Sequence, residues 1–192
     1  PEVASGYYNI GYVYFAQGDY SKALEYFEEV LKIRLSVYGE NHSRVASVYN
    51  DIGEIYSVQG DDFKALDYFK KSLKIVLSVY GENHSQVSSI YDHIGEVYFA
   101  QKDYSKALYY FEESLKIRLS LFGENHPEVA LSYYSIGSLY IIQGDKSKAL
   151  NYYEKSLKIR LSVYGENHPL TKEIMDLINV AANSKVLQSP ET

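Results

Sequence analysis

The chain has 192 residues, of which 46% are hydrophobic, and it carries a formal net charge of −6. These values allow a packed core, and the acidic balance argues against a nucleic-acid partner, because phosphate binding needs clustered lysine and arginine. The chain has no cysteine, which excludes disulfide bonds, thiolate metal sites and a cysteine nucleophile.

The sequence shows no membrane or targeting segment. No apolar run approaches the roughly 18 residues that a membrane span needs, and no basic flank followed by an apolar stretch occurs at the N-terminus. We therefore expect a soluble, cytoplasmic chain with no membrane partner, and the lack of cysteine fits a reducing compartment. Residues Pro1–Ala4 recur in register as Pro127–Ala130, which suggests a piece of a longer array.

An internal repeat of 42 residues dominates the sequence. The tetrapeptide GENH returns at residues 39–42, 81–84, 123–126 and 165–168. The repeats are 1–42, 43–84, 85–126 and 127–168, and the first and third share about 30 of their 42 residues. Such identity without insertions predicts one structural unit repeated four times.

Each repeat is predicted to be a helical hairpin. In the first repeat, apolar residues from Val3 to Tyr14 recur at steps of three and four, the pattern of an amphipathic helix. Gly18 then predicts a stop, and Asp19 can cap a second helix that continues to about Val37. A glycine inside each first helix predicts close helix packing against a small alanine, with aromatic rings around it. These glycines are Gly11, Gly53, Gly95 and Gly137, and the alanines are Ala23, Ala65, Ala107 and Ala149.

The pattern resembles the tetratricopeptide repeat, because Tyr7, Ile10, Gly11, Tyr14 and the Ala23/Phe27 pair reproduce the spacing of its signature. The unit is longer than the usual 34 residues, so the second helix gains roughly two turns, as in the repeats of kinesin light chain. The resemblance implies an all-α, right-handed superhelical solenoid of four helix-turn-helix repeats in a single domain, residues 1–192. Residues 169–185 are expected to form a capping helix with Pro169, Met175 and Ile178 at core positions, followed by a tail within 169–192.

No catalytic residue, cofactor or metal site is predicted, and the chain is not expected to be an enzyme. The GENH histidines are the first candidates for such chemistry, but packed helices stand roughly 8–10 Å apart, so histidines of successive hairpins should not share a metal. A role in the loop, near the start of the next helix, is the better interpretation. His93 is the only histidine outside this register.

Partner specificity should come from positions that differ between repeats. The resemblance implies that the first helix of each pair lines an inner groove, where positions 8, 9, 12 and 15 of the repeat vary. The predicted peptide-binding residues are Tyr8, Asn9, Tyr12, Asn50, Asp51, Glu54, Asp92, His93, Glu96, Tyr134, Ser135 and Ser138. Because this groove is acidic in the middle and aromatic at its ends, we expect a protein or peptide partner with basic and apolar residues.

Other interpretations remain open. The groove residues could be merely solvated, without a ligand. Alternatively, the array could be architectural and self-associate end to end or face to face, because no hairpin covers the outer side of the first helix, Val3 to Gln17. A third alternative, an enzyme, would need reactive groups converging in a closed pocket, and an open solenoid offers few such places.

Overall fold

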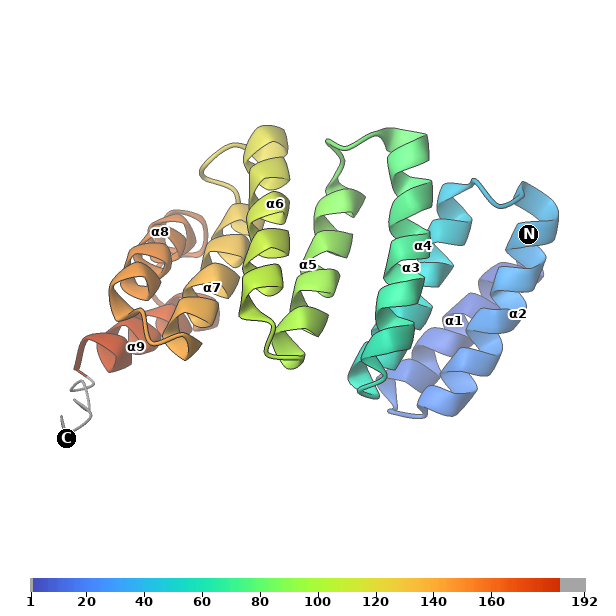
Figure 1. Ribbon diagram of the computed structural model, residues 1–192, viewed down its shortest axis with the longest axis horizontal. Coiled ribbons are helices and arrows are strands. Elements are labelled where there is room, and N and C mark those ends of the chain that lie inside the picture. The colour runs from blue at the N-terminus through green and yellow to red at the C-terminus, as the bar shows by residue number, and fades with distance from the viewer. Residues whose placement is uncertain (1, 184–192) are drawn as a thin grey trace. The chain divides into compact units, whose positions relative to one another are not determined.

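The computed structural model describes residues 2–183. Within these residues the chain forms nine helices and no strand (Figure 1). The helices are α1 (Glu2–Ala16), α2 (Tyr20–Tyr38), α3 (Ser43–Val58), α4 (Asp62–Tyr80), α5 (Ser85–Ala100), α6 (Tyr104–Phe122), α7 (Pro127–Ile142), α8 (Lys146–Tyr164) and α9 (Pro169–Asn183). The predicted all-α fold of four hairpins and a capping helix is confirmed. The last two residues of the predicted cap and the tail at 186–192 lie outside the described part.

Local capping explains where the second helices begin. The Asp19 carboxylate accepts a hydrogen bond from the Lys22 backbone N–H at 3.3 Å, and equivalent caps of 3.1–3.2 Å occur in the other three repeats. The preceding residue adopts a positive φ, which glycine does at no steric cost; φ is 77° at Gly18, and in the third repeat the residue is Lys102, with φ 62°. Each hairpin turn is therefore set by a few adjacent residues.

The GENH histidines are helix caps, which confirms the expected role near the next helix start. In His42, the ring Nδ1 accepts a hydrogen bond from the Arg44 backbone N–H at 3.1 Å, and the ring stacks on Tyr38 with centroids 4.5 Å apart. The same cap and stacking recur at His84, His126 and His168. This capping role explains why histidine recurs at the same position of every repeat.

The glycines inside the first helices lie closest to the aromatic rings that were expected around them, and at Gly137 an added Cβ would also lie 3.3 Å from the backbone oxygen of Ala149. A Cβ atom added to Gly53 would lie 2.7 Å from ring carbons of Phe69. Gly95 and Gly137 make the same close approach to the rings of Phe111 and Tyr153. The glycine thus provides the room in which a large side chain of the second helix is buried.

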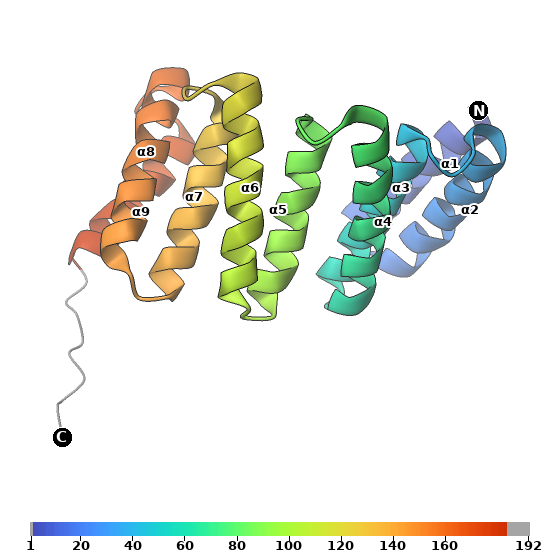
Figure 2. The ribbon, with the colours of Figure 1, turned by 45° about the horizontal axis from the view of Figure 1, so that its top comes forward.

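The chain divides into two compact units within α6, one reaching Ile117 and the other starting at Arg118. In the first unit, the α1–α2 and α3–α4 hairpins stand side by side and α5 packs against α4 (Figures 1 and 2). Their facing residues form clusters of Val, Ile, Ala and Phe side chains, including Phe27, Ile52 and Phe69. The single-domain assignment of residues 1–192 stays a prediction.

In the second unit, α7 and α8 form a hairpin and α9 packs against α8 (Figure 2). The residues of α9 that are buried are Thr171, Ile174 and Ala181. The sequence instead suggested Pro169, Met175 and Ile178 as core positions; Pro169 is exposed and the other two are only half-buried. The packed face of the capping helix is therefore rotated relative to the predicted one.

Candidate functional site

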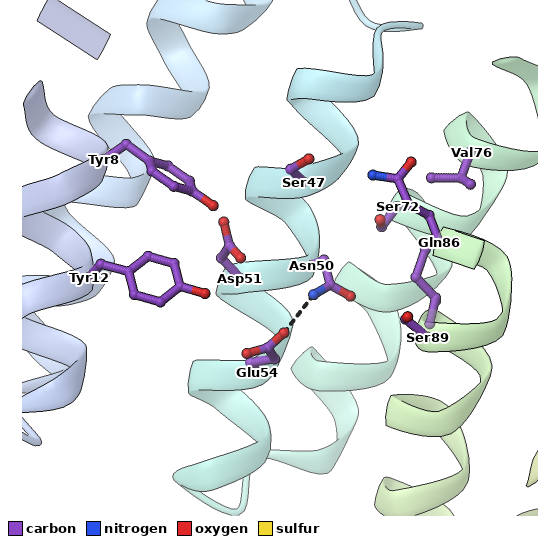
Figure 3. A pocket seen from close by; sticks show the side chains of 11 residues that line it. Tyr8, Tyr12, Ser47, Asn50, Asp51, Glu54, Ser72, Val76, Gln86 and Ser89 are labelled. Atoms are coloured by element: carbon purple, nitrogen blue, oxygen red, sulfur yellow. Dashed lines mark hydrogen bonds between the residues drawn. The ribbon is translucent and has the colours of Figure 1, made fainter. Parts of the chain in front are cut away.

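Nine of the twelve predicted groove residues lie on α1, α3 and α5 of the first unit, and three lie on α7 of the second. Five of the nine, together with residues of α4, line one pocket of about 260 Å³ (Figure 3). We call it the α1–α3–α5 pocket. Its lining residues are Tyr8, Tyr12, Ser47, Asn50, Asp51, Glu54, Ser72, Val76, Gln86, Ser89 and Ile90.

The two tyrosines of α1 face the carboxylate of α3 across one end of this pocket (Figure 3). The Tyr8 hydroxyl points toward the carboxyl of Asp51 (Figure 3), and this contact favours the ionised form of that carboxyl. Tyr8 and Tyr12 also pack edge-on against the buried Phe27 ring, with centroids 5.5 and 6.0 Å apart. The α1 side of the pocket is thus a wall of aromatic rings whose hydroxyls point toward an acid.

Asp51 is buried, with 8% of its surface exposed, whereas the sequence predicted an exposed groove residue. Burial raises the pKa of its carboxyl from the ordinary 3.8 to about 7; the charge of Glu54 acts in the same direction, and Tyr8 and Arg34 act against it. Its Oδ2 atom has no hydrogen-bond partner within the described residues. The pocket therefore contains a carboxylate oxygen that lacks the partner such a buried group normally has.

A polar network joins α3 to α5 at the floor of the pocket. The Asn50 amide donates to Glu54 Oε1 at 2.6 Å, and its Oδ1 lies 3.0 Å from His93 Nδ1. His93 Nε2 lies 3.6 Å from Glu54 Oε1. Burial raises the pKa of Glu54, and burial with the charges of Asp92 and Glu54 raises the pKa of Glu96. The acidic residues predicted for the middle of the groove therefore do lie close together.

The remaining predicted residues are not part of this pocket. Asn9 is exposed on α1. In the second unit, the Tyr134 hydroxyl donates to Glu173 Oε1 of α9 at 3.1 Å, and Ser138 shares a hydrogen bond with the Tyr153 hydroxyl at 3.1 Å. Ser135 is half-buried on α7.

Sequence reasoning missed the residues of α4 and the α5 start that complete the pocket, among them Ser72, Val76 and Gln86. A signal for two of them was present. Gln86 occupies a position that reads Arg44, Gln86 and Glu128 in successive repeats, and Val76 stands where the other repeats have arginine. Comparing the repeats at every position, rather than only at the inward positions of the first helix, would have found both.

Two searches of the described residues gave no further site. No group of three or more His, Cys, Asp or Glu side chains is arranged to hold a metal ion. No helix among residues 2–183 is both long and apolar enough to cross a bilayer.

A family model described as tetratricopeptide repeat matches residues 2–78, 44–120 and 86–162. The chain belongs to the tetratricopeptide repeat family. Repeats of this family generally serve as protein-interaction scaffolds without catalytic activity. No curated protein gave a significant match to this tetratricopeptide repeat chain.

Solved structures agree with the family assignment. BtubC (BKLC) from P. vanneervenii is 27% identical with a TM-score of 0.76, and the match covers 86% of this chain and 66% of that one. A putative kinesin light chain with nearly identical TPR-like repeats from Podospora anserina is 16% identical, TM-score 0.77, over 92% and 84% of the two chains. The apo form of RapI is 18% identical, TM-score 0.77, over 93% and 62%. This tetratricopeptide repeat chain thus spans about two thirds of the length of BtubC and of RapI.

Proposed function

We propose that the chain is a protein-interaction scaffold that binds a peptide or protein segment on the face formed by the first helices of its repeats. The observation that carries this proposal is the α1–α3–α5 pocket, where tyrosine rings and buried acidic groups meet on the expected binding face. Tyrosines offer large contact area at low entropic cost, and acidic groups select a basic partner. On the second unit, we propose Tyr134, Ser135 and Ser138 as further contacts.

The absence of basic residues from the pocket lining supports a basic partner. None of its lining residues is lysine, arginine or histidine, whereas Asp51 and Glu54 are both acidic. Association with a basic segment should therefore weaken as salt is added, because screening reduces attraction between charges.

The test is selection of peptides from a display library by the purified chain. We expect the selected sequences to be rich in arginine or lysine and to lose at least about tenfold in affinity for the double variant Asp51→Asn, Glu54→Gln. The control is Glu28→Gln, Glu29→Gln, which removes two charges from exposed positions of α2 and should leave affinity unchanged. Selected peptides that bind both variants as well as the parent would contradict the proposed binding face.

A second candidate function is self-association, which one specific observation favours. Val3, Ile10 and Val13 on α1 are 61%, 40% and 54% exposed. The residues at the same positions of the next repeat are fully buried; they are Val45, Ile52 and Ile55. A second copy of the chain could bury this face of α1 in the way that a neighbouring hairpin does within the array.

A further inference from the structure

One position in the second helices distinguishes the second repeat from the others. This position is occupied by an arginine in three repeats and by valine in the second. The four residues are Arg34, Val76, Arg118 and Arg160.

The first and last of these arginines make the same contacts. Arg34 Nη1 donates to the backbone carbonyl of Arg44 at 2.7 Å, and Arg160 Nη1 donates to that of Leu170 at 2.6 Å. Each guanidinium also lies over a tyrosine ring of its own repeat, 4.7 Å and 5.0 Å from the centroids of Tyr8 and Tyr134. Each therefore links its own hairpin to the start of the next first helix.

Arg118 occupies the same position with different contacts, and 4% of its side chain is exposed. Its Nη1 donates to Ser132 Oγ at 2.7 Å, and its Nη2 lies 3.0 Å from Glu128 Oε2. In three repeats, then, the space between a second helix and the next first helix holds a guanidinium with hydrogen-bond acceptors around it.

In the second repeat this space belongs to the α1–α3–α5 pocket. Val76 is too short to fill it and carries no charge, and Gln86 takes the place of Glu128 at the start of the next first helix. Gln86 Oε1 is buried and has no hydrogen-bond partner within the described residues. The same is true of Asp51 Oδ2, so the pocket has two buried acceptors that lack donors.

We infer that this pocket binds the guanidinium of one arginine side chain, supplied by the bound segment in place of the arginine that the chain itself supplies in its other repeats. The inference rests on the proposed function and specifies its ligand. A volume of about 260 Å³ is below the range of roughly 300–1,000 Å³ for small-molecule sites, so it suits a single side chain.

The chemistry favours arginine over lysine. A guanidinium carries five N–H donors in one plane and is weakly hydrated. It can therefore donate hydrogen bonds to the amide oxygen of Gln86 and to nearby carboxylate oxygens at the same time. An ammonium group is a more strongly hydrated point charge and loses more on entering a pocket of this size. The charges of Asp51 and Glu54 offset the cost of burying the cation.

The first experiment compares three probes on the whole chain: the blocked pentapeptide acetyl-Gly-Gly-Arg-Gly-Gly-amide and its lysine and citrulline counterparts. Binding is followed by the NMR shift of the Gln86 side-chain amide. We expect saturable binding of the arginine peptide, and at least about tenfold weaker binding of the uncharged but similarly shaped citrulline peptide. Equal shifts with the arginine and citrulline peptides, or no shift with either, would overturn the inference.

Two substitutions copy the chain's own repeats. Val76→Arg, as in the other three repeats, should fill the pocket and abolish binding of the arginine peptide while melting stays at or above the parent value. Gln86→Glu, as in the third repeat, should strengthen binding about threefold to tenfold by adding the carboxylate that Glu128 gives Arg118. The control Val79→Arg adds the same charge at an exposed position of α4 and should change nothing.

These results separate the inference from the function on which it rests. If library-selected peptides bind the Val76→Arg and Gln86→Glu variants as well as they bind the parent, the arginine pocket is wrong and the scaffold function stands. If the library yields no peptide that depends on the groove, the proposed function fails, whatever the pentapeptides show. If Val76→Arg fails to fold, the inference is still tested by Gln86→Glu and by the comparison of the arginine and citrulline peptides.

Discussion

Asp51 lies in an environment that disfavours the charged form of its carboxyl. It lies between the tyrosines of α1 and the polar network of α3, with its pKa raised to about 7 by burial. The groups that act on it are Tyr8 and Tyr12 on α1, Arg34 on α2 and Glu54 on its own helix. Ionisation of a buried carboxyl of this kind lowers the stability of the fold. Such destabilising groups are typical of residues that serve binding rather than packing.

The raised pKa predicts how stability depends on pH. Between about pH 4 and pH 7 the folded chain holds a proton on Asp51 that the unfolded chain releases, so stability falls as pH rises through this window and is level above it. Asp51→Asn removes the charge. The variant should therefore exceed the parent by about 1–3 kcal/mol at pH 8 and differ little at pH 4, as measured by urea unfolding at the two pH values. A difference that is the same at both pH values would show that Asp51 titrates normally.

At the scale of the helix, packing of a glycine against an aromatic ring determines how closely the two helices of a hairpin approach. Gly53→Ala should lower the free energy of unfolding by about 1–3 kcal/mol, because the added Cβ would lie 2.7 Å from the Phe69 ring. Gly6→Ala is the matched control, since Gly6 lies in α1 with no heavy atom within 4 Å of an added Cβ. It should instead raise stability by about 0.5–1 kcal/mol, and chemical denaturation measures both changes. A neutral Gly53→Ala would mean that the ring can move aside at little cost.

The helices were predictable from the sequence because their ends depend on neighbouring residues. The Asp19 side chain accepts a hydrogen bond from the backbone N–H three residues later, and the His42 ring accepts one from the backbone N–H two residues later. The repeated pattern therefore contains the residues that determine the helix boundaries. The burial of Asp51 was not predictable in this way. It depends on packing against Tyr8, which lies 43 residues earlier in the chain. His93, the residue of α5 that corresponds to Asp51, is only half-buried. The sequence identified which positions vary, but only packing between hairpins shows which of them lose contact with water.

At the scale of the whole molecule, the outer face of α1 exposes apolar residues at positions that are buried in α3 and α5. The repeat places Val3, Ile10 and Val13 where α3 and α5 carry residues buried against the preceding hairpin, and apolar area of this kind gains free energy when it is removed from water. We therefore expect concentration-dependent dimers in sedimentation velocity experiments. The double variant Ile10→Lys, Val13→Lys should be monomeric at every concentration, because two facing copies would bring like charges together.

Leu131→Lys is a suitable control for this experiment, because Leu131 is exposed on α7, in the second compact unit. It adds a charge to an exposed apolar position and should leave association unchanged. If the parent chain is monomeric over a wide concentration range, the face of α1 does not drive self-association, and the binding-scaffold function becomes the sole candidate. If the parent dimerises and both variants dimerise equally, the contact lies elsewhere on the surface. Only loss of dimers in the α1 variant alone would show that two copies replace the hairpin contact that α3 and α5 obtain from their own chain.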